Sequence, residues 1–196
     1  MLYNKIKLSD SCTIYRAHDE NFQLKKQRLL ELISVNRKFV KLHSGNSVIV
    51  EIRAKELDKI NSEIKSIISD ITGRDFINYA ENYWIYTQTK GFDLEWMHQH
   101  ILVHPLGRTT FKTDFTFTYY VQTPKDIKGD EGHIVFQTED KKLHKYLPEE
   151  GDIFIFPADL RHTAIPTPES DIDRLVYAGS LCIDIENQKD VKKSII

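Results

Sequence analysis

Three histidines have the residue type and the spacing to bind a metal ion. His98 and His100 are separated by one residue, and His162 follows much later in the chain. Because side chains alternate along a strand with a period of two residues, His98 and His100 would share one face of a strand over 97–103. A third imidazole from a distant strand would complete one side of a coordination shell. Neutral imidazole nitrogen suits iron, zinc, copper or nickel, so these residues predict a metal site.

Two further histidines are weaker candidates. His104 has the same strand parity as the pair, but Pro105 follows it and indicates that the strand ends there. His133 falls inside a predicted strand and could reach a pocket, although a lone histidine in such a position is more often structural.

An arginine at the start of an apolar strand indicates a binding site for an anion. Arg174 precedes a run of leucine, valine, tyrosine and alanine. Burying an arginine side chain in such a strand is costly unless the guanidinium binds an anion. Arginine binds carboxylates in a bidentate geometry. The alternative is a salt bridge to Asp171, Asp173 or Asp184.

The segment 115–121 alternates between an apolar and a polar face. Its odd positions are Phe, Phe, Tyr and Val, whereas its even positions are Thr116, Thr118 and Tyr120. The odd positions predict a core face. A polar face of this kind points either to water or to a ligand, because buried polar groups need partners.

The elements that must position these residues divide the chain into a helical and a β-rich part. Steps of three and four between apolar residues predict an amphipathic helix over 54–71, which ends before Gly73, and a second helix over 19–37 with Asp19 as a possible N-cap. We expect both to pack against a sheet. Short runs rich in β-formers, separated by turn residues, predict strands over 83–87, 97–103, 115–122, 133–137, 152–156 and 175–185.

Composition is that of an ordinary globular protein. The 196 residues are 40% hydrophobic and 29% charged, with a net charge of -2 that offers no electrostatic footprint for nucleic acid. No apolar run is long enough to span a bilayer, and the first residues form no secretory signal. The two cysteines, Cys12 and Cys182, are not in a zinc-binding spacing, and we expect reduced thiols in a cytoplasmic protein.

Together these patterns predict one mostly β domain over 1–196. A helical N-terminal part (1–75) would pack on one sheet of a barrel-like or sandwich-like β core (76–187), followed by a frayed tail (188–196). The organisation overall is α+β, and oligomeric state is not encoded in any motif.

The β-rich part resembles the iron(II)- and 2-oxoglutarate-dependent oxygenases, especially small prolyl-hydroxylase-like members from bacteria and phages. The resemblance covers about residues 83–185 and is carried by short motifs. These are His98-Gln-His100, Thr118-Tyr-Tyr-Val121, Gly132-His-Ile-Val-Phe136, Gly151-Asp-Ile-Phe-Ile-Phe-Pro157, His162 and Arg174.

The resemblance implies a double-stranded β-helix, the jelly-roll core that cupins share, with helices packed on its outside. It implies that His98 and His162 are iron ligands and that Arg174 and Tyr120 bind the distal carboxylate of the co-substrate 2-oxoglutarate. Gln88 stands where relatives often have a tyrosine that contacts this co-substrate, and Thr118 belongs to the same motif. Such enzymes use dioxygen to convert 2-oxoglutarate to succinate and CO2 while they hydroxylate a C–H bond.

Two positions depart from the family pattern. His100 stands where most members have Asp or Glu, and Val176 stands where Ser or Thr is common. The first departure leaves three outcomes: an active three-histidine site, a carboxylate such as Asp114 supplied from elsewhere, or a degenerate site that prefers zinc or nickel. The second removes one hydrogen bond to the co-substrate.

Two other functions fit parts of the pattern. A cupin-type metalloenzyme would use the three histidines, but the glutamate of its first motif is absent after His100, and Arg174 would have no role. A non-catalytic jelly-roll binding module would have incidental histidines. For an oxygenase, the substrate would be a small molecule or a peptide, and no motif in residues 1–82 identifies it.

Overall fold

We analysed a computed structural model of the chain, which describes residues 1–35, 40–41, 48–50, 55–75, 80–91, 96–103 and 111–183. Its two helices are α1 (Phe22–Val35) and α2 (Lys55–Thr72). The strands, in chain order, are β1 (Tyr3–Lys7), β2 (Thr13–His18), β3 (Val40–Lys41), β4 (Val48–Val50), β5 (Ala80–Gln88), β6 (Leu102–Val103), β7 (Phe111–Lys112), β8 (Phe115–Gln122), β9 (Ile134–Gln137), β10 (Leu143–Tyr146), β11 (Asp152–Pro157), β12 (Arg161–Ala164) and β13 (Arg174–Cys182).

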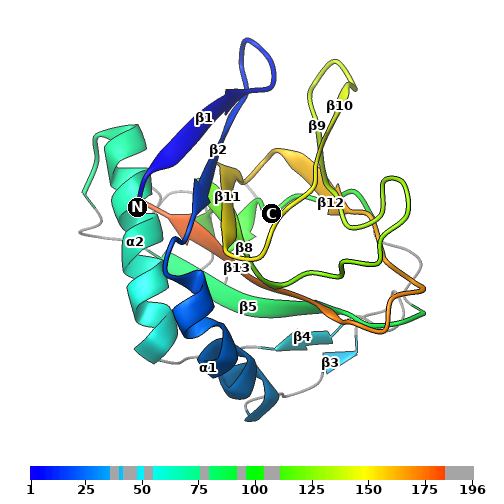
Figure 1. Ribbon diagram of the computed structural model, residues 1–196. Coiled ribbons are helices and arrows are strands. Elements are labelled where there is room, and N and C mark those ends of the chain that lie inside the picture. Colours follow the sequence, from blue (N-terminus) through cyan, green and yellow to red (C-terminus); the bar gives the residue numbers. More distant parts are fainter. Residues whose placement is uncertain are drawn as a thin grey trace.

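Two antiparallel sheets form the centre of the protein. The larger has eight strands in the order β1-β2-β11-β8-β13-β5-β4-β3, and the smaller has three in the order β10-β9-β12. A separate pair joins β6 to β7. Figure 1 shows both helices beside the larger sheet and the smaller sheet on its other side. The predicted mostly β core with N-terminal helices packed on one sheet is therefore confirmed.

The two faces of the larger sheet have separate cores, because alternate side chains point to opposite faces. The outer core joins the predicted apolar stripes of both helices to residues such as Phe117, Tyr119 and Tyr177. The inner core lies between the two sheets and contains Tyr120, Phe136, Phe154, Phe156 and Val176, among others.

The polar face of β8 points into this inner space and not to solvent. Thr116 and Tyr120 are 0% and 1% exposed. Tyr120 packs in the inner core, where its ring lies edge-on to Phe154 at 6.0 Å between centroids. Of the two alternatives for this face, the solvent-facing one is therefore wrong.

The N-terminal third contains strands as well as the predicted helices. β1 and β2 form a hairpin that adds to the edge of the larger sheet, where β2 pairs with β11. These strands show no clear alternation of apolar and polar residues in the sequence, because β1 is exposed at three of its five positions. Helix α1 begins at Phe22, three residues after Asp19, whose carboxylate accepts a hydrogen bond from the backbone NH of Asn21 at 3.1 Å.

The predicted strand over 97–103 is mostly wrong. Only an isolated bridge at His98 and the short β6 are present there. The reason is that successive backbone groups bind different segments: His98 pairs with His162, whereas the NH of His100 donates to the carbonyl oxygen of Ala158 at 2.9 Å. The segment therefore crosses the β11–β12 connection and does not run along one partner.

Other boundaries differ by small amounts. β9 begins at Ile134, so His133 lies just before the strand and its Nδ1 contacts the carbonyl oxygen of Asp130.

No disulfide joins Cys12 to Cys182. Among the described residues, no helix is both long enough and apolar enough to cross a membrane. His104 and the predicted tail over 188–196 lie outside the described residues.

Close packing at Gly179 yields a test of the outer core. A Cβ atom at this position of β13 would lie 2.5 Å from Phe117 Cε1 and 2.5 Å from Tyr83 Cδ1. We expect Gly179→Ala to lower the free energy of unfolding by about 1–3 kcal/mol, the usual cost of overpacking a core, as measured by urea denaturation.

Phe117→Leu provides the matched background. The smaller side chain removes part of the steric conflict, so Gly179→Ala should cost less in this background than in the wild type, and the double-mutant cycle should be non-additive. Equal costs in both backgrounds would contradict the proposed contact.

Candidate metal and co-substrate site

A reciprocal pair of backbone hydrogen bonds brings His98 to His162. The NH of His98 donates to the carbonyl oxygen of His162 at 2.9 Å, and the NH of His162 donates to that of His98 at 3.0 Å. The two residues are direct partners in an antiparallel bridge, so their side chains leave the backbone on the same side. Their ring centroids are 4.5 Å apart.

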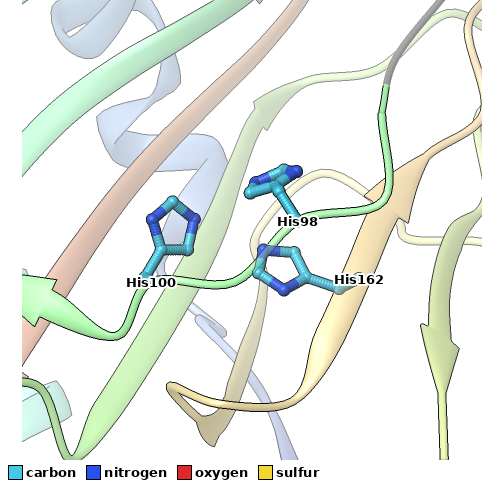
Figure 2. Close-up of side chains that lie close together, drawn as sticks. All are labelled: His98, His100 and His162. Atoms are coloured by element: carbon cyan, nitrogen blue, oxygen red, sulfur yellow. The ribbon is translucent and has the colours of Figure 1, made fainter.

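His100 completes the cluster. Its ring centroid lies 4.9 Å from that of His98 and 5.1 Å from that of His162. One nitrogen atom from each ring can be chosen so that all three lie within 4.8 Å of one another. Figure 2 shows the rings converging, with His98 and His100 on one segment and His162 on a facing strand. The structure thus brings together all three histidines that the sequence nominates as metal ligands.

Backbone carbonyl groups fix the tautomers of two of these rings. Nδ1 of His98 lies 2.8 Å from the carbonyl oxygen of Trp96, and Nδ1 of His162 lies 2.9 Å from that of Leu160. A carbonyl oxygen only accepts hydrogen bonds, so each Nδ1 carries the proton and each Nε2 keeps its lone pair. This is the arrangement that orients histidine ligands in metal sites.

Burial keeps the cluster neutral. Desolvation, helped by the neighbouring His98, lowers the pKa of His100 to about 3. Desolvation is also the main reason that the pKa of His162 lies well below its ordinary value, with His98 and His100 adding to the effect. Metal ions bind the neutral imidazole, so the two rings are ready for a metal at neutral pH without losing a proton.

No carboxylate belongs to the cluster among the described residues. Asp114, the alternative donor that the sequence suggested, uses its carboxylate elsewhere, since Oδ2 accepts a hydrogen bond from the NH of Ile183 at 2.8 Å. Asp114 is therefore not a member of the cluster in this structure. The donor set is three neutral nitrogen atoms, which suits the divalent ions from iron to zinc.

Arg174 is buried, and its partners among the described residues are neutral. It is 1% exposed; its Nη1 donates to Gln88 Oε1 at 3.4 Å and its Nη2 to the Tyr120 hydroxyl at 3.3 Å. The guanidinium carbon also lies 5.2 Å from the centroid of the Tyr120 ring. The buried Nε has no hydrogen-bond partner. Gln88 and Tyr120, which the resemblance assigns to the same co-substrate as Arg174, thus lie beside it.

Neither Asp171 nor Asp173, two of the three salt-bridge partners suggested for Arg174, forms a recorded ion pair with it. Within the described part of the chain, no carboxylate forms an ion pair with its guanidinium. Asp171 instead pairs with Lys90 at 2.6 Å, and Asp184 lies outside the described residues. A buried guanidinium without an anion is expensive, which marks this position as a place for an anionic ligand.

The arginine and the histidines border the same inner core. Aromatic neighbours connect them: Tyr120 lies against Phe154, Phe154 against Phe136, and Phe136 lies 6.4 Å from His162 between ring centroids. Thr118 is on the same face of β8 as Tyr120, and its buried hydroxyl has no hydrogen-bond partner. It is paired in register with the small Ala178 on β13.

Sequence reasoning missed two aromatic residues on β5. The Trp84 ring packs on His100 with centroids 5.0 Å apart, and the Tyr86 hydroxyl accepts a hydrogen bond from Gln88 Nε2 at 3.3 Å. The available signal was parity, because residues 84, 86 and 88 share one face of a strand. His133 is outside the cluster.

Comparison by sequence finds no relative. No protein-family model matches the chain, and no curated protein matches it.

Comparison by structure finds close similarity of fold. A prolyl hydroxylase of Trichoplax adhaerens, solved with a peptide fragment of a hypoxia inducible factor, is 14% identical over 88% of this chain and 84% of its own, with a TM-score of 0.64. A prolyl-4-hydroxylase of Pseudomonas putida is 13% identical over 86% and 92%, with a TM-score of 0.62.

A third structure has metal and co-substrate bound. HygX of Streptomyces hygroscopicus, solved with nickel and 2-oxoglutarate, is 12% identical over 88% of this chain and 83% of its own, with a TM-score of 0.58. The chain therefore has the double-stranded β-helix fold of the iron(II)- and 2-oxoglutarate-dependent oxygenases, which confirms at the level of fold the resemblance carried by its motifs.

Proposed function

We propose that the protein is a non-haem iron(II)- and 2-oxoglutarate-dependent dioxygenase that hydroxylates a small molecule or a peptide. The balanced reaction converts a substrate C–H bond, 2-oxoglutarate and dioxygen into a C–OH group, succinate and CO2. Bound iron(II) supplies the activation of dioxygen, and the protein supplies binding, orientation and exclusion of water.

The observation that carries this proposal is the buried Arg174, which has no anionic partner among the described residues. Its free Nε and its weakly held Nη atoms offer a two-pronged site for a carboxylate. The three-histidine cluster borders the same inner core. 2-Oxoglutarate suits both features. Its distal carboxylate would pair with the guanidinium of Arg174, and its 2-oxo acid end would bind the metal at the histidines.

Each side chain of the site has a distinct part. His98, His100 and His162 would hold the metal through neutral nitrogen atoms. Arg174, aligned by Gln88 and Tyr120, would bind the distal carboxylate, and the Thr118 hydroxyl is a further donor on the same face of the sheet.

Val176 cannot donate the hydrogen bond to 2-oxoglutarate that Ser or Thr at this position would donate. Its side chain is buried in the inner core and has no hydroxyl to offer the co-substrate. Gln88 and Tyr120 are the polar groups beside the guanidinium instead.

The alternatives account for less of the site. A cupin-type metalloenzyme would use the histidines, but it gives no role to Arg174 and its two neutral partners. A non-catalytic jelly-roll module would explain neither the converging histidines nor the unpaired Arg174 Nε. A peptide substrate is favoured over other classes only by the peptide in the Trichoplax hydroxylase structure.

Metal analysis tests the ligand set. We expect the wild type to bind one equivalent of iron(II) or its substitute cobalt(II). His98→Ala, His100→Ala and His162→Ala should each weaken binding by about tenfold or more, because each removes one of three ligands. Anaerobic titration against a competing chelator measures the affinities.

His144→Ala is the control, because His144 is not a member of the cluster. It should bind metal like the wild type. Full affinity in the His100→Ala variant would contradict a three-histidine site and would indicate a ligand from another residue.

Co-substrate binding tests the role of Arg174. Calorimetry on anaerobic iron-loaded protein should detect one 2-oxoglutarate per chain, and turnover should release succinate. Arg174→Met should weaken binding by about 100-fold, since hydrogen bonds to charged groups contribute about 1.5–3 kcal/mol each. The proposal fails if the wild type does not bind 2-oxoglutarate or if the variant binds it equally well.

Arg161→Met provides a matched control, because it removes an exposed arginine from β12, next to His162. It should leave 2-oxoglutarate binding unchanged. A comparable loss of affinity in both variants would mean that general charge, and not the buried guanidinium, governs binding.

A further inference from the structure

The ring of His100 is held differently from the other two rings of the cluster. Nδ1 of His98 and Nδ1 of His162 each lie beside a backbone carbonyl oxygen, which orients the ring by a hydrogen bond. The ring of His100 packs on the indole of Trp84, with centroids 5.0 Å apart and an angle of 41° between the two planes. Trp84 thus supports the His100 ring from outside the cluster.

The backbone on both sides of this contact is fixed. Trp84 lies within β5, where it pairs with Ala178 of β13, and both strands are in the interior of the larger sheet. The backbone NH of His100 donates to the carbonyl oxygen of Ala158 at 2.9 Å. Because neither backbone is free to shift, packing between the two rings limits the side-chain torsion angles that His100 can adopt.

The same face of β5 also reaches Arg174. Side chains at positions 84, 86 and 88 share one face of the strand. The Tyr86 hydroxyl accepts a hydrogen bond from Gln88 Nε2, and Gln88 Oε1 accepts one from the guanidinium of Arg174 at 3.4 Å. One strand therefore contacts a candidate metal ligand through Trp84 and the arginine of the candidate co-substrate site through Gln88.

We propose that Trp84 is a positioning residue, which holds the ring of His100 in the orientation that binds the metal. This inference rests on the proposed function, because it concerns one ligand of the metal. Trp84 is not itself a ligand, since the indole nitrogen only donates hydrogen bonds. Its part is to order the His100 ring in advance, so that less side-chain entropy is lost when the metal binds.

Metal affinity tests this role without turnover. Trp84→Leu should weaken cobalt(II) binding by about tenfold, the lower end of the usual effect of removing a group that orients a metal ligand. Trp84→Phe keeps an aromatic ring at this position and should recover most of the loss. Anaerobic titration against a competing chelator measures the affinity of each variant.

A double-mutant cycle shows whether Trp84 acts through His100. In a His100→Ala background the ring that Trp84 orients is gone, so Trp84→Leu should not weaken cobalt(II) binding further. In a His98→Ala background His100 remains, so Trp84→Leu should still weaken binding by about tenfold. A general loosening of the site would instead weaken binding by the same factor in both backgrounds.

Nuclear magnetic resonance of the metal-free protein provides a second measurement. Three-bond coupling constants of isotope-labelled histidine report the first side-chain torsion angle. In Trp84→Leu the constants of His100 should change toward averaged values, whereas those of His98 and His162 should stay as in the wild type, because backbone carbonyl groups orient these two rings. Unaveraged constants for His100 in this variant would contradict the proposed role.

Tyr83→Leu is the matched control. It removes an aromatic ring from the neighbouring residue of β5, whose side chain packs in the outer core against Phe117 and Tyr177. It should lower the free energy of unfolding in urea but leave cobalt(II) affinity unchanged. A loss of affinity as large as that of Trp84→Leu would mean that the stability of the sheet, and not the ring contact, governs metal binding.

The outcomes separate this inference from the proposed function. A wild type that does not bind cobalt(II) would overturn both. Cobalt(II) binding by the wild type with full affinity in Trp84→Leu, or with equal losses in the His100→Ala and His98→Ala backgrounds, would overturn the role of Trp84 alone.

Discussion

Arg174 is the largest fully buried side chain in the described protein, and no carboxylate of the described residues balances the charge of its guanidinium group. The larger sheet must accommodate it, because β13 lies between β8 and β5 and both neighbours direct a polar side chain toward it. Tyr120 comes from one side and Gln88 from the other. A sheet core that carries such a group gains stability when an anion binds, so ligand binding and stability are linked.

The histidine cluster depends on a different constraint, the reciprocal backbone bridge between His98 and His162. This bridge pairs an otherwise irregular segment with β12 of the smaller sheet. The NH of His100 donates to the carbonyl oxygen of Ala158, so the same segment is also bound to the connection that precedes β12. The three histidines therefore lie together at one corner of the fold. Their geometry does not require a continuous strand, which explains why the site forms although the predicted strand over 97–103 does not.

The sequence predicted the chemical groups better than the elements that carry them. His98, His100, His162 and Arg174 were recognisable because spacing and the cost of burying charge are visible in a single sequence. β1, β2, β10 and β12 were not, because short strands with exposed polar residues show no alternation and acquire their partners only through distant pairing. Trp84 lies in a strand that the sequence did predict, but its contact with His100 was missed because that contact depends on how two remote segments meet.

Position 100 links the two constraints electrostatically. Under the proposed function, a carboxylate there would lower the net positive charge of the metal centre. With a neutral imidazole, the bound metal and Arg174 would both attract the dianion 2-oxoglutarate under the proposed function. Substitution of His100 by aspartate would therefore change both the affinity for the metal and the charge of the site that receives the co-substrate.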